Sequence, residues 1–193
     1  MKGEIRQTVG FALCGSYCTH AAALAQLDAL LQKGYDVVPI VSERVWETDT
    51  RFGTAEALCK SIAAKCGKEI IHTIKEAEPL GPAKPLSALV ICPCTGNTLA
   101  KLAAGVTDSA VCMAAKAHLR GDRPLLLALA SNDAMSANLQ NIATLLNRKN
   151  VFFVPVRQDD PTSKPHSLVA EFSLVPQALE QALLGRQMRK LFL

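Results

Sequence analysis

Short apolar runs alternate along this chain with segments whose apolar residues recur at helical spacing. The runs predict buried strands at 8–13, 35–41, 69–73, 86–91, 124–130 and 151–156. The helical spacing, as in Leu24, Leu27 and Leu31, predicts helices at 20–33, 54–66, 106–119, 134–147 and 174–184. Strands that alternate with helices and read as continuous apolar runs are typical of a parallel sheet covered on both faces. We therefore predict a doubly wound, three-layer α/β/α fold.

Four polar turns come directly after predicted strands. They contain Gly15-Ser16, Ser42-Glu43-Arg44, Thr95-Gly96-Asn97-Thr98 and Ser131-Asn132-Asp133. Ligands of such sheets bind beyond the carboxyl ends of the strands, so we expect all four turns to line one rim. The stretches 77–85 and 158–166, which contain several prolines or aspartates, predict loops.

Of the four turns, the one at 95–98 offers the largest set of groups that can bind a ligand. It follows the apolar run 88–91 and opens a helix, with two threonine hydroxyls and one asparagine amide beside free backbone N–H groups. The start of a helix favours anions because its N–H groups point outward and its dipole is positive there. The turn therefore predicts a site for a phosphate-bearing ligand, although Thr95 and Asn97 as simple helix caps would explain part of the pattern.

Size and composition narrow the class of protein. With 193 residues, 49% hydrophobic and 20% charged, the chain predicts one globular domain spanning 1–193. The net charge of +4 without a Lys/Arg block argues against a nucleic-acid partner. No stretch reaches the ~20 apolar residues of a membrane span, so we expect a cytoplasmic protein. The seven cysteines predict reduced thiols, and no ligand spacing predicts a metal site.

Two common nucleotide motifs are absent. The turn after the first strand, at Gly15, lacks G-x-G-x-x-G and the acid that follows it, so it predicts no standard NAD site. The chain also has no Walker A sequence.

The stretch 92–110 resembles the P-x-T-A-N-T-x-A-K-x-A-x-G-x-x-D pattern of flavoproteins that include phosphopantothenoylcysteine decarboxylases, lantibiotic cysteine decarboxylases and flavin prenyltransferases. The positions that match are Pro93, Thr95, Asn97, Thr98, Ala100, Lys101, Ala103, Gly105 and Asp108. Gly96 replaces the alanine of the pattern, and we expect this change to be neutral. The resemblance implies a flavodoxin-like, homo-oligomeric protein that binds FMN at this rim.

The same resemblance implies roles for single residues. It places FMN on eight of them: Gly15, Ser16, Ser42, Thr95, Asn97, Thr98, Ser109 and Asn132. The catalytic histidine of the decarboxylases precedes the strand that carries the Thr/Asn turn, which implies His72. Their P-x-M-N-x-x-M motif survives only at Asn132 and Met135, and this departure argues against a substrate derived from cysteine.

Four further stretches, 42–53, 76–81, 154–161 and 164–170, resemble the B subunits of bacterial dipicolinate synthases. That resemblance runs nearly from end to end of the chain. That resemblance implies formation of pyridine-2,6-dicarboxylate from dihydrodipicolinate in sporulation, together with an A subunit. A dicarboxylate substrate needs cationic partners, for which the chain offers Arg44, Arg51, Lys164 and His166.

Two alternatives stay open from the sequence. One is an FMN-dependent decarboxylase of a small thiol acid, which the intact Thr/Asn turn favours. The other is a non-catalytic binding subunit whose A partner performs the redox step with a nicotinamide cofactor.

Overall fold

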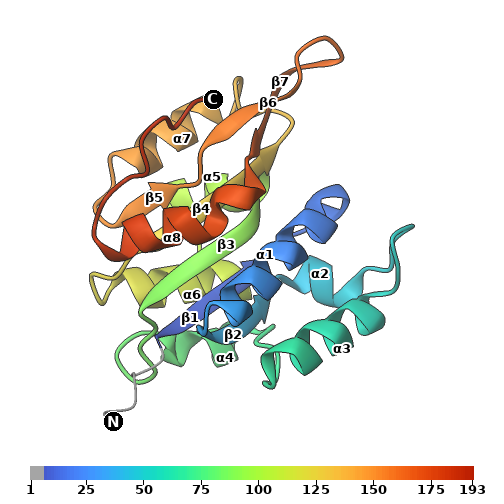
Figure 1. Cartoon of the computed structure of the whole chain (residues 1–193), viewed down its shortest axis with the longest axis vertical. Helices are drawn as coiled ribbons and strands as arrows, with labels where there is room; N and C mark the ends of the chain where they lie inside the picture. The colour runs from blue at the N-terminus through green and yellow to red at the C-terminus, as the bar shows by residue number, and fades with distance from the viewer. Residues whose placement is uncertain (1–6) are drawn as a thin grey trace.

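The apolar runs form the strands of one mixed sheet in a computed structural model, which describes residues 7–193 (Figure 1). Within that range the sheet has seven strands: β1 (Thr8–Leu13), β2 (Asp36–Val41), β3 (Ala88–Thr95), β4 (Leu125–Ser131), β5 (Val151–Phe153), β6 (Val156–Asp160) and β7 (Lys164–Ala170). Strands β1 to β5 are parallel in the order β2-β1-β3-β4-β5. This is the flavodoxin-like order, so the predicted fold class is confirmed.

The last part of the sheet differs from the prediction. β7 runs antiparallel to β4 and to β6, so the sheet is not wholly parallel. The single strand expected at 151–156 is split, and most of the loop expected at 158–166 is a β-hairpin that projects from the body (Figure 1). The Asp160 side chain accepts the N–H groups of Thr162 and Ser163, so only the tip forms a turn.

Eight helices connect or flank these strands in residues 7–193: α1 (His20–Gln32), α2 (Glu43–Glu47), α3 (Ala55–Cys66), α4 (Ile74–Ala77), α5 (Gly96–Ala104), α6 (Ala110–Leu119), α7 (Leu139–Leu146) and α8 (Val175–Leu183). Three short 3₁₀ turns join them: η1 (Tyr17–Thr19), η2 (Glu78–Leu80) and η3 (Phe172–Leu174). No helix in this part of the chain is long and apolar enough to cross a membrane.

Several boundaries differ from the prediction. The helix expected from 106 begins at Ala110, and the helix expected from 134 begins at Leu139 because the preceding residues form turns. The strand expected at 69–73 is reduced to one bridge between Ile71 and Ile40. The loop expected at 77–85 begins inside helical turns, because Thr73 and Glu76 form a capping box that starts α4.

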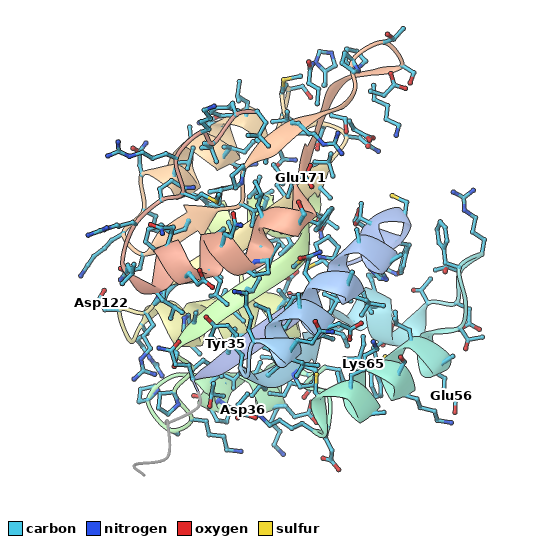
Figure 2. The ribbon with its side chains drawn as sticks, in the orientation of Figure 1. Tyr35, Asp36, Glu56, Lys65, Asp122 and Glu171 are labelled. Atoms are coloured by element: carbon cyan, nitrogen blue, oxygen red, sulfur yellow. The ribbon has the colours of Figure 1, made fainter. Side chains whose placement is uncertain are left out.

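Two apolar layers enclose the sheet. Side chains of α1, α3 and α8 pack on one face and those of α5, α6 and α7 on the other, which gives the predicted three layers (Figure 1). Thr54 caps the start of α3, and Gly67 ends it with a φ of 61°. Lys65 of α3 lies on the outer surface (Figure 2). Its ammonium lies 2.6 Å from Asp28 of α1, which ties these helices together. Because β1, β2 and β3 are parallel, their carboxyl ends meet at one edge of the sheet.

Candidate functional site

A cleft of about 870 Å³ lies at the carboxyl edge of β1, β2 and β3. We call it the main cleft, and it is lined by Cys14, Gly15, Tyr17, Ser42, Glu43, Arg44, Glu47, Thr48, Thr95, Asn97, Thr98, Lys101, Asp108 and Ser109. These residues come from four separate parts of the chain. Parallel strands bring the turns that follow them to the same edge, which explains why the segments meet here.

Most of the residues expected to hold FMN lie together in the main cleft. Six of the eight line it, namely Gly15, Ser42, Thr95, Asn97, Thr98 and Ser109. Ser16 lies between two lining residues, and its carbonyl accepts the Thr19 hydroxyl at 2.8 Å. Asn132 is exposed in the turn after β4 and lies outside the main cleft. The structure thus brings three of the four predicted turns to one cavity.

The Thr95 turn is tied to the end of β1. Thr95 caps α5 by accepting the N–H of Thr98 at 3.2 Å. The Thr98 hydroxyl in turn donates to the Cys14 sulfur at 3.3 Å. Burial raises the pKa of the Cys14 thiol to about 12, so the thiol stays protonated at neutral pH and is no nucleophile. This thiol therefore serves packing and hydrogen bonding rather than covalent chemistry.

A second helix, α6, also begins at the main cleft. Ser109 caps it by accepting the N–H of Cys112 at 3.1 Å. Glu43 of α2 reaches across the cleft wall and accepts the N–H of Ala110 at 2.8 Å. The carboxylate thus neutralises part of the positive end of α6. Sequence reasoning assigned no role to Glu43, and the only available signal was its place directly after Ser42.

The charges of the main cleft are largely satisfied within the protein. Lys101 lies 2.9 Å from Asp108, and this contact raises the pKa of the lysine and lowers that of the aspartate. Arg44 is exposed and forms no ion pair with any residue in 7–193. Its backbone carbonyl accepts the Tyr17 hydroxyl at 2.9 Å. The cleft therefore presents one cation that is free to meet an anion, beside two helix N-termini.

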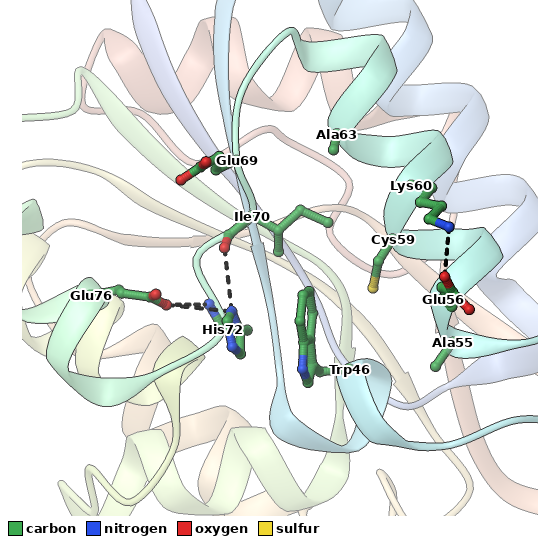
Figure 3. Close-up of a pocket in the computed structure, with 10 residues that line it drawn as sticks. All are labelled: Trp46, Ala55, Glu56, Cys59, Lys60, Ala63, Glu69, Ile70, His72 and Glu76. Atoms are coloured by element: carbon green, nitrogen blue, oxygen red, sulfur yellow. Dashed lines mark hydrogen bonds and ion pairs between the residues drawn. The ribbon is translucent and has the colours of Figure 1, made fainter.

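His72 lies next to the main cleft rather than in it. Its ring stacks on Trp46, with centroids 3.8 Å apart and planes inclined by 12° (Figure 3). Its Nδ1 lies 3.4 Å from a carboxylate oxygen of Glu76. Trp46 and His72 line an apolar side pocket of about 550 Å³ between α2 and α3, and both also line a second hollow whose wall includes Asp108. The structure places the predicted catalytic histidine one pocket away from the predicted cofactor residues.

The four residues expected to meet substrate carboxylates are not brought together. Only Arg44 lines the main cleft. Arg51 lies over the Phe52 ring at 4.9 Å, in the loop between α2 and α3. Lys164 and His166 lie on the exposed part of β7, where Lys164 contacts Asp159 at 2.6 Å.

Metal and disulfide chemistry find no support in residues 7–193. No group of three His, Cys, Asp or Glu side chains in this range is arranged to hold a cation. All cysteines of the range carry free thiols.

Known proteins resemble the whole chain. A family model described as Flavoprotein matches residues 3–171. The B subunit of dipicolinate synthase from Bacillus subtilis (strain 168) is 46% identical over 181 residues, which cover 94% of this chain and 90% of that protein. The crystal structure of the B subunit of dipicolinate synthase from Bacillus halodurans C is 40% identical, with a TM-score of 0.89 over 97% of this chain and 96% of that chain. The FMN-dependent cysteine decarboxylase SpaF, at 22% identity, shares the fold with a TM-score of 0.63 over 91% of this chain and 97% of that chain.

Proposed function

The chain belongs to the Flavoprotein family, and we propose that it works as the B subunit of a dipicolinate synthase with FMN bound in the main cleft. The observation that carries the proposal is the convergence of six predicted flavin residues on one cavity. The identity of 46% with the Bacillus subtilis protein supports the choice of reaction.

The donor set of the main cleft fits a flavin mononucleotide. The first turn of α5 offers the N–H groups of Gly96 and Asn97, because Thr95 accepts only that of Thr98. Such N–H groups suit a phosphate. The Asn97 amide and the Ser42 hydroxyl suit the polar ribityl chain. Of the three acids that line the cleft, Glu43 and Asp108 already have partners in the protein, and Glu47 is exposed to solvent.

The proposed reaction converts dihydrodipicolinate into pyridine-2,6-dicarboxylate. FMN, when bound, supplies a two-electron acceptor for the hydride that a dihydropyridine releases as its ring becomes aromatic. The contribution of this chain is to bind and orient the two reactants. Arg44 presents a guanidinium that suits one substrate carboxylate. His72 lines the same hollow as Asp108, which itself lines the main cleft. His72 is therefore the candidate to hold or move a proton.

We also propose the partners. An A subunit would complete the enzyme, with a nicotinamide cofactor on that partner as the further electron carrier. We expect a homo-oligomer of this chain that works in the cytoplasm of sporulating cells. The oxidoreductase type of the reaction belongs to this proposal as well.

A flavin titration tests the cofactor. Adding FMN to the purified protein should quench flavin fluorescence to saturation, and Asn97→Ala should weaken binding by about tenfold, the loss of roughly one buried polar contact. Asn147→Ala is the matched control, because its side chain bonds the Ala143 carbonyl at the far end of α7. A protein that neither carries nor takes up FMN would contradict the proposal.

A reconstituted assay tests the reaction. The chain is mixed with the A subunit and dihydrodipicolinate, and the ultraviolet absorbance of the pyridine product is followed. Arg44→Ala should raise the KM for the dicarboxylate, while Arg148→Ala, on the loop after α7, should leave it unchanged. Full activity of the A subunit without this chain would instead favour a non-catalytic binding role. The position of His72 outside the main cleft is the observation that supports this alternative.

A further inference from the structure

Gly96, the first residue of α5, lies against a polar cluster at the end of β4. A Cβ added at this position would meet the Asn138 amide nitrogen at 2.7 Å and an Asp133 carboxylate oxygen at 2.8 Å, and would overlap the Ser131 hydroxyl. Contacts this short force the neighbours to move. The cluster therefore fills the space that the methyl group of the alanine in the family pattern would need.

The cluster is a closed network centred on Asp133. The Ser131 hydroxyl donates to one of its carboxylate oxygens, and the Asn138 amide donates to both oxygens at 2.9 Å. Asn138 is only 5% exposed, and its own oxygen accepts the Asn141 amide at 2.9 Å. Every member has a partner, so none of these side chains is free to swing aside for a methyl group at low cost.

The network joins three elements at the rim. Ser131 ends β4, Asn138 precedes α7, and Gly96 begins α5, which packs against α7 (Figure 1). The hydrogen bonds from Ser131 and Asn138 lower the pKa of Asp133, so the carboxylate is ionised at neutral pH. A carboxylate beside the first residue of a helix is stabilised by the positive end of that helix. The network thus packs against the first turn of α5 from outside the main cleft.

The two neighbours of Gly96 in the sequence belong to the cavity wall. Thr95 and Asn97 both line the main cleft, so their directions depend on how the first turn of α5 is seated. We infer that Asp133 is a positioning residue, whose hydrogen-bonded carboxylate seats Gly96 and thereby aims Thr95 and Asn97 at the FMN phosphate and ribityl chain. This inference rests on the proposed function for the identity of the ligand, but not for the seating itself.

The experiment compares Asp133→Ala with Ser136→Ala. Ser136 lies in the same loop and its hydroxyl donates to the backbone carbonyl of Asp133 at 3.1 Å, so its loss leaves the carboxylate network intact. Far-UV circular dichroism first establishes that both variants fold. Asp133→Ala should raise the Kd for FMN about tenfold, as expected for a coupled polar network. Ser136→Ala should stay within about twofold of the unaltered protein.

A second readout needs no ligand. Hydrogen–deuterium exchange of the peptide that spans 95–102 should be faster in Asp133→Ala and unchanged in Ser136→Ala. If the unaltered protein binds no FMN, the proposed function fails while this exchange still decides the inference. Equal effects of the two variants on the exchange, or none from Asp133→Ala, would overturn it.

Gly96→Ala approaches the same contact from the other side, and its single effect on FMN binding and on exchange of the peptide 95–102 keeps the test decisive if Asp133→Ala does not fold: no effect on either would overturn the inference. Alone it should weaken FMN binding, because the added methyl group pushes the network away. Combined with Asp133→Ala it should raise Kd by less than the product of the two single fold-changes, since Ser131 and Asn138, no longer held by the carboxylate, can then move away from the methyl group. A full product would mean that the residues act independently, against the inference.

Discussion

Mild acid should destabilise this protein through His118, which is buried in α6. Its Nε2 lies 2.9 Å from the carbonyl oxygen of Pro124. A carbonyl only accepts, so Nε2 carries the hydrogen and the neutral ring leaves Nδ1 bare. Within residues 7–193 the buried Nδ1 has no hydrogen-bond partner. Protonation would create a buried cation with an unpaired N–H, and the substitution His118→Gln removes that possibility.

The sign and size follow from proton linkage. Burial lowers the pKa of His118 from 6.5, the nearby charge of Arg123 lowers it further, and the Pro124 carbonyl partly offsets both. Below pH 6.5 the unfolded chain therefore binds a proton that the folded protein does not, and stability falls as the pH falls. The limiting slope is about 1.4 kcal/mol per pH unit for each such histidine. Burial lowers the pKa of His20 as well, so the two together give at most about 2.7 kcal/mol per unit.

The assay is urea unfolding followed by far-UV circular dichroism at pH 7.5, 6.5 and 5.5. His118→Gln keeps an amide that can donate to the Pro124 carbonyl, but it cannot titrate. The variant should lose the His118 share of the pH dependence that the unaltered protein shows between pH 6.5 and 5.5, and so be less sensitive to acid. His166→Gln, at an exposed position on β7, is the control and should keep the original dependence. Carboxylates contribute little in this window, because their ordinary pKa values lie near 4.

Two results would refute this reasoning. One is an unfolding free energy that does not change between pH 7.5 and 5.5 in the unaltered protein. The other is a pH dependence that His118→Gln leaves intact, which would mean that the ring is protonated equally in the folded and unfolded states.

Three further changes test packing and capping, each by urea unfolding. Gly10→Ala should cost about 1–3 kcal/mol by overpacking, because its Cβ would lie 2.7 Å from two buried leucine methyl groups. Leu127→Ala, in the fully buried centre of β4, should cost about 2–5 kcal/mol through the cavity it leaves. Glu43→Ala should cost about 1–2 kcal/mol by removing the carboxylate that accepts the Ala110 N–H, and an equal loss from Glu47→Ala would contradict this specific role.

Local signals in the sequence were enough for most of the fold. Strands β1 to β4 are continuous apolar runs, and a buried parallel strand leaves no other pattern. The β6–β7 hairpin was missed because its exposed end, near Asp160 and Pro165, has the composition of a loop. Only Leu168 and Ala170, at its inner end, carry the buried alternation of a strand.

The part of the candidate site that is built from turns directly after strands was predictable from the sequence. The turns at Ser42 and Thr95 meet because parallel strands align their carboxyl ends, whatever their distance in the sequence. Contacts between side chains of distant elements left no local signal. The bond from Glu43 to α6 and the stacking of His72 on Trp46 depend on how helices and loops pack around the sheet. The same holds for Gly96, whose neighbours come from β4 and the turn after it.

The main cleft is built from turns that lie far apart in the chain, at Gly15, Ser42, Thr95 and Ser109. An unfolded chain cannot assemble them, so any occupant binds the folded state alone and shifts the folding equilibrium by mass action. At a free concentration one hundred times its Kd, such an occupant adds about 2.7 kcal/mol to the unfolding free energy. The melting temperature should therefore rise with ligand concentration, and protein that lacks its ligand would be the form most exposed to proteolysis.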